Sequence, residues 1–219
     1  MNFVDWQLID YKIAWDKQAG IFQEVIGKKM NGEATEKSET IIFCEHPHVY
    51  TIGKSGHDQN LLISDETLKQ IGAVFYHIDR GGDITYHGPG QLVGYPIVDL
   101  ERHEMSLKGY IFAIEEAVIK TLAEYGITGM RLQGATGVWL DVGSARTRKI
   151  CAIGVKASRF VTMHGFALNV NTDLNYFTYI NPCGFVDKGV TSLCKELGNP
   201  VDMNQVKMQM KTHLLALFS

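Results

Sequence analysis

The sequence predicts an α+β fold in which a mixed, largely antiparallel sheet is flanked by helices. Helix-like and strand-like segments come in runs and do not alternate regularly, which favours this class over a doubly wound parallel sheet. Between Thr136 and Asn171, strand-like segments are separated by glycine and polar residues, which indicates an antiparallel meander. The chain has 219 residues and is 45% apolar, which suits one large domain or two small ones with a substantial core. It contains no Pro/Ser linker, and we expect one domain, residues 1–219.

In the first half of the chain, apolar side chains recur at roughly helical spacing from Tyr11 to Met30, which predicts a helix. Short apolar runs at residues 40–46 and 73–79 predict strands. The run "QLVGYPIVDL", residues 91–100, is also expected to be a strand. Its Pro96 has no N–H to donate to a neighbouring strand, which favours an edge position or a bulge.

In the second half, a helix is predicted after Ser106, a residue type that caps helix N-termini. Apolar residues then repeat at intervals of three and four, and Gly126 ends the pattern. An amphipathic segment at residues 201–218 predicts a closing helix. The meander between these helices is expected at "TGVWLDV", "KICAIGVKAS" and "MHGFALNVN".

Composition narrows the classes of function. The formal net charge of −3 provides no broad basic face, so nucleic acid is disfavoured as a partner. The first twenty residues carry acidic side chains and no signal-peptide pattern, and no stretch reaches the roughly 18 apolar residues of a membrane span. The four cysteines, at positions 44, 151, 183 and 194, form no C-x-x-C pair. We therefore expect a cytoplasmic protein with reduced thiols and no membrane partner.

The sequence lacks the patterns of known phosphate, dinucleotide and metal sites. The stretch "HVYTIGKS" ends like a P-loop, but His48 stands where the P-loop needs its first glycine, and no G-x-G-x-x-G follows a strand. Histidines gather at positions 46, 48 and 57 and are scattered elsewhere, at 77, 87, 103 and 164. None is spaced as H-x-x-x-H or lies near a carboxylate at a recognised zinc spacing, so no metal is predicted.

Cys183 lies in an unusual setting for a cysteine. It follows Pro182 and precedes Gly184 in "INPCGF", which is too broken to be the interior of a strand or helix. Cys44 and Cys151, in contrast, lie in apolar segments that are typical of structural cysteines. A cysteine displayed on such a turn is a candidate nucleophile, because the adjacent backbone can present an amide to an oxyanion.

A nucleophilic thiol at Cys183 needs a neighbouring base or cation, because a thiol with an ordinary pKa of ~8.5 is only slightly ionised at neutral pH. Candidates are His87, His164 and the lysines of "TRKICAIGVK". Lys149 opens an apolar run, where partial burial would lower its pKa and let it act as a base. The sequence alone leaves open which of these groups lies near Cys183.

Taken together, "RGGDITYHGPGQ", "KICAIGVK", "HGFALNV" and "NPCG" resemble motifs of the lipoyl(octanoyl) transferase family, and the likeness runs from about Glu45 to about Leu197. The resemblance implies a fold similar to the catalytic domain of biotin and lipoate protein ligases. It also implies transfer of an octanoyl or lipoyl group from acyl carrier protein to a lysine of a lipoyl domain, the first step of endogenous protein lipoylation, with no cofactor.

The same resemblance implies roles for individual residues and partners. Cys183 matches the acyl-thioester nucleophile, and Lys149 matches the lysine that activates it. The implied partners are octanoyl-acyl carrier protein and the apo lipoyl domains of 2-oxoacid dehydrogenase complexes and of the glycine cleavage H protein. The implied substrate-binding residues are Arg80, Gly81, Gly82, Asp83, Ile84, Thr85, Tyr86, His87, Ala152, Ile153, Gly154, Gly165, Phe166 and Ala167.

One departure from the family and two alternative functions bear on this interpretation. Cys151 stands where the family usually has a small residue such as alanine, and strand alternation predicts that it shares a face with Lys149. An ATP-dependent lipoate-protein ligase of the same fold would need no nucleophilic cysteine, so the turn around Cys183 argues against it. A module that binds acyl carrier protein or lipoyl domains without catalysis is the other alternative.

Overall fold

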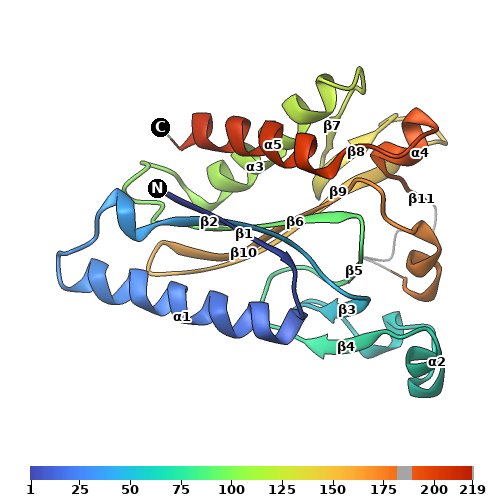
Figure 1. The fold of residues 1–219 in the computed structure, drawn as a ribbon, viewed down its shortest axis with the longest axis horizontal. Coiled ribbons are helices and arrows are strands. Elements are labelled where there is room, and N and C mark those ends of the chain that lie inside the picture. The colour runs from blue at the N-terminus through green and yellow to red at the C-terminus, as the bar shows by residue number, and fades with distance from the viewer. Residues whose placement is uncertain (182–188, 219) are drawn as a thin grey trace.

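The computed structural model describes residues 1–181 and 189–218. The strands of its larger sheet are β1 (Asn2–Leu8), β2 (Thr40–Glu45), β6 (Gln91–Ile97), β7 (Met130–Leu132), β8 (Ala135–Leu140), β9 (Arg148–Ser158), β10 (Val161–Asn169) and β11 (Gly189–Val190). Their order is β1-β2-β6-β10-β9-β8-β7, with β11 beside β9 (Figure 1). The pairs β1–β2 and β9–β11 are parallel and the other pairs are antiparallel, which confirms the predicted mixed, largely antiparallel sheet.

A smaller sheet lies beside the larger one. Its strands are β3 (Val49–Ile52), β4 (Val74–His77) and β5 (Ile84–His87), in the order β4-β3-β5. The short helix α2 (Asp65–Gln70) lies beside this sheet (Figure 1). Residues 84–87 belong to the glycine-rich stretch "RGGDITYHGPGQ", which is therefore in part a strand paired with β3.

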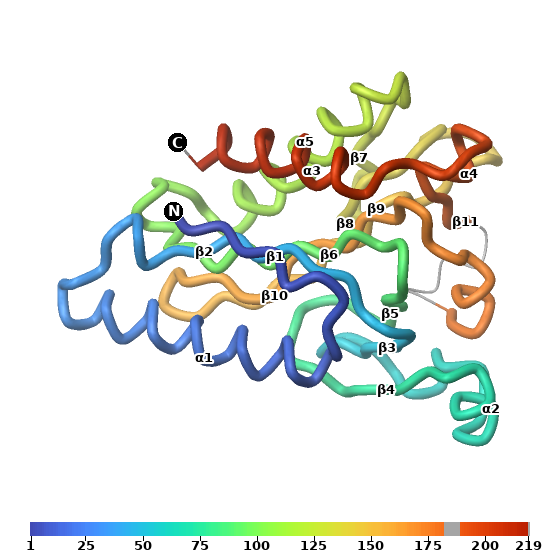
Figure 2. Tube along the Cα trace, viewed as in Figure 1, coloured from blue at the N-terminus to red at the C-terminus, as the bar shows by residue number. Residues whose placement is uncertain are grey.

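Helices cover both faces of the larger sheet, as Figures 1 and 2 show. Helix α1 (Tyr11–Met30) lies on one face, and α3 (Leu107–Ala123) and α5 (Met203–Leu217) lie together on the other. The five-residue helix α4 (Leu193–Leu197) precedes α5. Among the described residues, no helix combines the length and the apolar character needed to cross a membrane.

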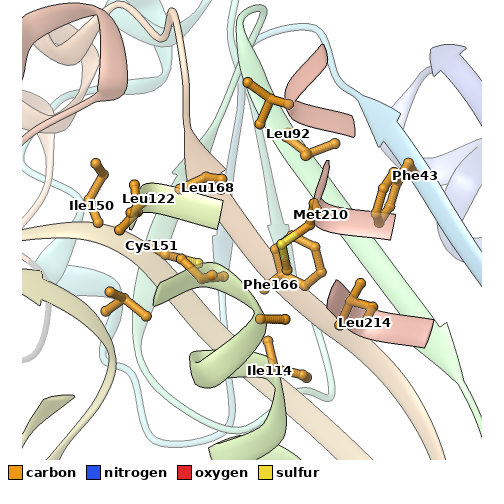
Figure 3. Packing of buried hydrophobic residues seen from close by; sticks show 14 of the residues in the cluster. Phe43, Leu92, Ile114, Leu122, Ile150, Cys151, Phe166, Leu168, Met210 and Leu214 are labelled. Carbon is orange, nitrogen blue, oxygen red and sulfur yellow. The ribbon is translucent and has the colours of Figure 1, made fainter. Parts of the chain in front are cut away.

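The pairing register assigns side chains to the two faces of the sheet, because residues directly opposite each other in a ladder share a face. Leu168 is opposite Leu92 on β6 and Cys151 on β9, and all three pack under α3 and α5 (Figure 3). The next residue, Ala167, is opposite Val93 and Ala152 on the α1 face. At this point of the sheet, the face under α3 and α5 therefore carries large core side chains, and the α1 face carries smaller ones.

The helices and the meander that the sequence predicts are present. Asp10 and Ser106 cap α1 and α3, accepting hydrogen bonds from the backbone N–H groups of Ile13 and Gly109 at 3.1 Å each. The closing helix α5 is present, and β8, β9 and β10 form a continuous antiparallel meander. Strand β1, which the sequence analysis did not predict, pairs parallel to β2 at the sheet edge.

The edge position suggested for Pro96 is wrong. Strand β6 lies between β2 and β10, inside the sheet, and Pro96 is paired with Ile41 of β2. On the β10 side the ladder ends at Gly94, and beyond it His164 has a left-handed backbone with φ of 63°. An irregularity in the neighbouring strand thus removes the need for an N–H at Pro96, so the missing donor is tolerated in an interior strand.

We predict that Gly165→Ala destabilises the fold by about 1–3 kcal/mol, the usual cost of overpacking a well-packed core. A Cβ at residue 165 would lie 2.1 Å from the backbone oxygen of Gly94, which cannot rotate away. Urea denaturation would measure the loss. As a control, Gly20→Ala in α1 has no atom within 4 Å of the new Cβ and should gain about 0.5–1 kcal/mol. Equal stability of the two variants would contradict the packing described here.

Candidate active site

A cavity of about 600 Å³ lies against the centre of the larger sheet. Its walls include Ala152–Gly154 of β9 and Gly165–Ala167 of β10, and Lys149 lines it as well. The glycine-rich segment completes the enclosure with the following residues: Arg80, Gly81, Gly82, Asp83, Ile84, Thr85 and His87. Three segments far apart in the sequence, each predicted to bind substrate, therefore meet around one space.

The segment Arg80–Gly82 is held directly on strand β9. The Gly81 N–H donates to the Val155 oxygen at 2.9 Å, and a Cβ at Gly154 would lie 2.9 Å from the Gly81 oxygen. On its other side the segment accepts a hydrogen bond from the Lys54 N–H to the Arg80 oxygen at 3.0 Å. Glycine at 154 is thus required for a close backbone approach that closes the cavity.

The side chain of Arg80 is buried between its own loop and strand β3. Its guanidinium donates to the Thr51 backbone oxygen at 2.7 Å, to the Thr51 hydroxyl at 3.0 Å and to the Gly81 oxygen at 3.0 Å. Asp83 accepts from its neighbour Ile84 N–H at 2.6 Å and from the Asn60 amide at 2.8 Å. These contacts fix the shape of the glycine-rich segment, with Arg80 and Asp83 lining the cavity.

All of the predicted binding residues are described, and Tyr86 alone among them does not line the cavity. Its ring is fully buried in the core of the smaller sheet and stacks on Tyr176, with ring centroids 5.0 Å apart. Its hydroxyl is hydrogen-bonded to Nδ1 of His48 at 2.7 Å. Along β5 the side chain of Tyr86 points to the face opposite that of its neighbours Thr85 and His87, which line the cavity.

Lys149 lies near the start of β9, opposite Trp139 of β8. Its Nζ is 4.5 Å from the centroid of the Trp139 ring, and its backbone oxygen accepts a hydrogen bond from the Thr191 N–H at 2.9 Å. The predicted nucleophile, Cys183, falls in residues 182–188, outside the described residues. The geometry therefore places Lys149 with the binding segments, and Cys183 stays a prediction.

The expectation that Cys151 shares a face with Lys149 is wrong. Cys151 is fully buried in the core under α3 and α5 (Figure 3) and does not line the cavity, whereas Lys149 does. The register between β8 and β9 shifts here: Val138 pairs with Cys151, but Trp139 pairs with Lys149, which leaves Ile150 as an extra residue. The bulge reverses the alternation, and burial raises the pKa of the Cys151 thiol.

His87 belongs to a polar chain inside the cavity wall. Its Nδ1 is 2.8 Å from Oε1 of Gln91, and Nε2 of Gln91 is 2.9 Å from Oδ1 of Asn169. Its ring stacks on that of Tyr11 with centroids 5.8 Å apart. Burial is the main reason that the pKa of His87 falls to about 3, so the imidazole is neutral.

A second buried histidine, His46, lies edge-on to His87 with ring centroids 6.0 Å apart. Its Nδ1 bonds to the Ile9 oxygen at 2.8 Å, and its Nε2 bonds to the Tyr95 hydroxyl at 2.7 Å. Burial lowers the pKa of His46 to about 4. Within residues 1–181 and 189–218, no group of three or more His, Cys, Asp or Glu side chains is arranged to hold a metal ion.

His164 lines the cavity in different surroundings. Its Nε2 donates to Asp79 at 2.8 Å, and Asp79 also accepts from Lys156 at 2.5 Å. Burial lowers the pKa of His164 even though the carboxylate opposes this, and the hydrogen bond from His164 keeps the pKa of Asp79 well below its usual range. Nδ1 of His164 is buried and lacks a hydrogen-bond partner among the described residues.

Sequence reasoning missed several cavity residues, including Tyr11, Gln91, Tyr95, Trp139 and Asn169. Gln91 and Asn169 lie inside the motifs "RGGDITYHGPGQ" and "HGFALNV", so their motif membership was a usable signal. Tyr11 belongs to no motif and reaches the cavity from the first residue of α1. Only the fold could reveal that contribution.

The sequence of this chain is similar to those of known proteins. Residues 10–215 match the family model of the lipoyl protein ligase A/B catalytic domain. An octanoyltransferase of Bacteroides fragilis is 59% identical over 212 residues, covering 97% of this chain and 95% of the relative. One from Parabacteroides distasonis is 56% identical over 219 residues, covering 100% and 98%. The chain belongs to the octanoyltransferases of the lipoyl protein ligase A/B catalytic domain family. It is therefore an acyltransferase.

Solved structures agree on the fold of this octanoyltransferase family member. A bipartite lipoate protein ligase of Thermoplasma acidophilum has a TM-score of 0.71 at 14% identity, covering 99% of this chain and 82% of that one. A lipoate-protein ligase A with bound ATP gives 0.68 at 15% identity, covering 99% and 84%. A biotin protein ligase of Aquifex aeolicus gives 0.54 at 13% identity, covering 99% and 70%. These likenesses confirm the predicted ligase-like fold.

We predict that the free energy of unfolding falls as the pH falls below about 6.5, where an unfolded histidine takes up a proton. Folded His46 does so only at about 4 and folded His87 at about 3. In this range the unfolded chain binds more protons, so each histidine contributes a slope of about 1.4 kcal/mol per pH unit. Urea denaturation between pH 4.5 and 7 measures it.

The variant His46→Gln separates this effect from general acid sensitivity. Removing one of the two buried neutral histidines should take about 1.4 kcal/mol per pH unit from the slope. The stability of the variant near neutral pH can be lower because the Tyr95 contact changes, but only the slope is diagnostic. A slope identical to that of the unchanged protein would contradict the neutral, buried state of His46.

Proposed function

We propose that this protein transfers an octanoyl or lipoyl group from acyl carrier protein to a lysine of an apo lipoyl domain, through a thioester on Cys183. Residues 1–219 act as one catalytic domain in this proposal, and no cofactor is used. The observation that carries it is that Lys149 lines the same cavity as the three predicted binding segments. Membership of the octanoyltransferases supports the octanoyl group as the transferred acyl group.

In the first half-reaction the acyl group moves from one sulfur to another. Lys149 accepts the proton of the Cys183 thiol, and the thiolate attacks the carbonyl carbon of the carrier-bound thioester. The bond from the carbonyl carbon to the carrier sulfur breaks, and Lys149 returns the proton to the departing thiolate. One thioester replaces another, so the step is nearly isoenergetic and requires no ATP.

In the second half-reaction the acyl group moves from sulfur to nitrogen. The neutral amine of the acceptor lysine attacks the carbonyl carbon of octanoyl-Cys183, and the bond from that carbon to sulfur breaks. Lys149 takes a proton from the amine nitrogen and passes it to the Cys183 thiolate. An amide replaces a thioester, which makes this half-reaction downhill.

The cavity suits an acyl chain as the bound group. Val93, Ile153, Phe166 and Ala167 give it apolar walls, while Lys149, His87 and Asn169 provide polar groups. Binding sites for small ligands commonly combine a mostly apolar lining with a few such groups. The proposed orientation has the acyl chain along β9 and β10 and the thioester carbonyl toward Lys149.

The proposed acceptors are the apo lipoyl domains of 2-oxoacid dehydrogenase complexes and of the glycine cleavage H protein, and the proposed donor is octanoyl-acyl carrier protein. The Thermoplasma acidophilum system pairs a lipoate protein ligase with its E2 lipoyl domain, which supports a lipoyl domain as a partner for this fold. We further propose a cytoplasmic location, since Cys44, Cys151 and Cys194 are free thiols, as expected in a reducing compartment.

A thioester on Cys183 predicts acylation without nucleotide. Incubation with octanoyl-acyl carrier protein alone should add one octanoyl mass to the protein, as measured by intact mass spectrometry, and Cys183→Ala should abolish the adduct. Cys194→Ala, at a cysteine outside the cavity lining, is the matched control and should acylate normally. Product formed only with ATP, without an acylated protein, would instead favour a ligase like the ATP-bound structural neighbour.

Proton transfer by Lys149 predicts that Lys149→Ala lowers the transfer rate by roughly 10²–10⁴-fold, the usual range for a general base. Lys149→Arg should not restore the rate, because arginine keeps the charge but does not release a proton at working pH. Alkylation of Cys183 in the alanine variant should shift to higher pH.

The exposed Lys120 on α3 gives the control for this experiment, and Lys120→Ala should leave both the rate and the alkylation profile unchanged. Unfolding by urea should show that Lys149→Ala is within about 1 kcal/mol of the unchanged protein, as for substitutions away from the core. Full activity of Lys149→Arg would mean that the residue acts only as a cation.

A further inference from the structure

The hydrogen bonds around His87 determine which of its ring nitrogens carries the proton. The series of hydrogen bonds that starts at His87 finishes at two backbone carbonyl oxygens, which can only accept hydrogen bonds. The side-chain amide nitrogen of Asn169 is 3.0 Å from the Thr191 oxygen, and that of Gln91 is 3.1 Å from the Tyr86 oxygen. Nδ2 of Asn169 must therefore donate to Thr191, which turns its Oδ1 toward Gln91.

The orientation of the Gln91 amide determines which atom faces His87. Nε2 of Gln91 donates both to the Tyr86 oxygen and to Oδ1 of Asn169, so Oε1 of Gln91 is the atom that faces His87. Since Oε1 accepts, Nδ1 of His87 must carry a hydrogen and donate to it, across 2.8 Å. Reversing either amide would place an oxygen against a carbonyl oxygen.

The imidazole of His87 is neutral, so its other nitrogen has no hydrogen. Burial is the main cause of the low pKa, and the facing groups His46, Arg80 and His164 add to it, while the hydrogen bond to Gln91 opposes it. Among the described residues, the ring's one hydrogen bond is through Nδ1, and His87 lines the cavity. Nε2 is therefore a hydrogen-bond acceptor available to a ligand, and it cannot donate.

This acceptor is connected to the backbone of Lys149 through hydrogen bonds in the sheet. Asn169 connects Gln91 with the Thr191 oxygen, and the Thr191 N–H in turn donates to the Lys149 oxygen at 2.9 Å. The histidine and the lysine are thus joined through consecutive hydrogen bonds across β6, β10 and the segment after β11. The ring of Tyr11 stacks on the face of the imidazole and so helps to fix the plane of the His87 ring.

We propose that Nε2 of His87 accepts a hydrogen bond from the attacking amine of the acceptor lysine and so aims the nitrogen lone pair at the acyl carbonyl. The inference rests on the proposed function. An acceptor cannot stabilise the oxyanion or bind the carbonyl oxygen, both of which need donors. The attacking amine of the second half-reaction has N–H bonds that can donate to such an acceptor, and the amine must be oriented for its lone pair to reach the carbonyl carbon.

His87 does not remove the proton in this step. The nitrogen–carbon bond forms and the carbon–sulfur bond to Cys183 breaks, as above, while the proton goes to Lys149 and then to the departing sulfur. Because Nε2 stays unprotonated throughout, it contributes alignment in the manner of a substrate-positioning group. The acceptor chemistry that this site selects is therefore a neutral primary amine.

The tautomer can be tested without any assumption about activity. Nitrogen NMR of protein with ¹⁵N-labelled histidine distinguishes a protonated from an unprotonated ring nitrogen. His87 should show hydrogen on Nδ1 and none on Nε2 from pH 5 to 8. A hydrogen on Nε2 at any pH in this range would overturn the proposal.

The kinetic test compares the two half-reactions in single turnover, with octanoyl-acyl carrier protein as donor and an apo lipoyl domain as acceptor. His87→Asn keeps a donor to Gln91 but loses the Nε2 acceptor. It should slow transfer to the acceptor about tenfold more than it slows formation of octanoyl-protein, the rate effect of one hydrogen bond between neutral groups. His87→Gln, whose longer side chain can place an oxygen near the Nε2 position, should restore part of the loss.

The exposed His77 provides a matched control, since His77→Asn should alter neither step. Equal slowing of both half-reactions in His87→Asn would indicate a structural role only, and an unchanged second step would refute the positioning role. If the unchanged protein never becomes acylated, the proposed function itself fails, which is a different result from either.

Discussion

The backbone hydrogen bonds between β9 and β10 position Ala152–Gly154 and Gly165–Ala167 in the cavity wall. Gly154 is opposite Gly165 and Ala152 is opposite Ala167, so a patch of the smallest residues forms on the α1 face of the sheet. One position further along, Cys151 is opposite Leu168 on the other face, where both are fully buried. The same ladder thereby places its smallest residues on one side of the sheet and contributes to the core on the other.

The glycine-rich segment depends on this ladder in turn. Its backbone rests on β9 through the hydrogen bond from Gly81 to Val155, and its side chain Arg80 reaches back to Thr51 of the smaller sheet. The smaller sheet is therefore joined to the larger one at the cavity itself. A substitution that separated Gly154 from Gly81 would open the cavity and also loosen the contact between the two sheets.

Local signals in the sequence were sufficient for α1, α3, α5 and the β8–β10 meander, and motif membership indicated three segments of the cavity wall. The caps Asp10 and Ser106 mark the starts of α1 and α3, and the motif residues of β9 and β10 line the cavity because small residues in a strand leave space beside it. What failed depended on pairing between distant strands. Pro96 is interior because of its neighbour's backbone, and a single register shift turns Cys151 away from Lys149.

The hydrogen-bond chain of His87 could not be predicted for a related reason. Gln91 follows it closely, but Asn169 and Thr191 come from β10 and from the segment after β11, so the direction of each amide is fixed only when all of them meet. Tyr11, at the start of α1, supplies the stacking partner from the opposite end of the chain. A tautomer is thus a property of the assembled sheet, whereas a motif identifies only the residue type.

The two histidines that line the cavity illustrate how partners decide what a residue type can do. His164 donates through Nε2 to the Asp79 carboxylate, an anion that Lys156 also contacts, so the charged group is the one that orients it. His87 donates through Nδ1 to a neutral amide, which cannot stabilise an imidazolium as a carboxylate does. His87 therefore presents a neutral acceptor to the cavity, suited to an uncharged amine, whereas His164 is oriented by an ion pair.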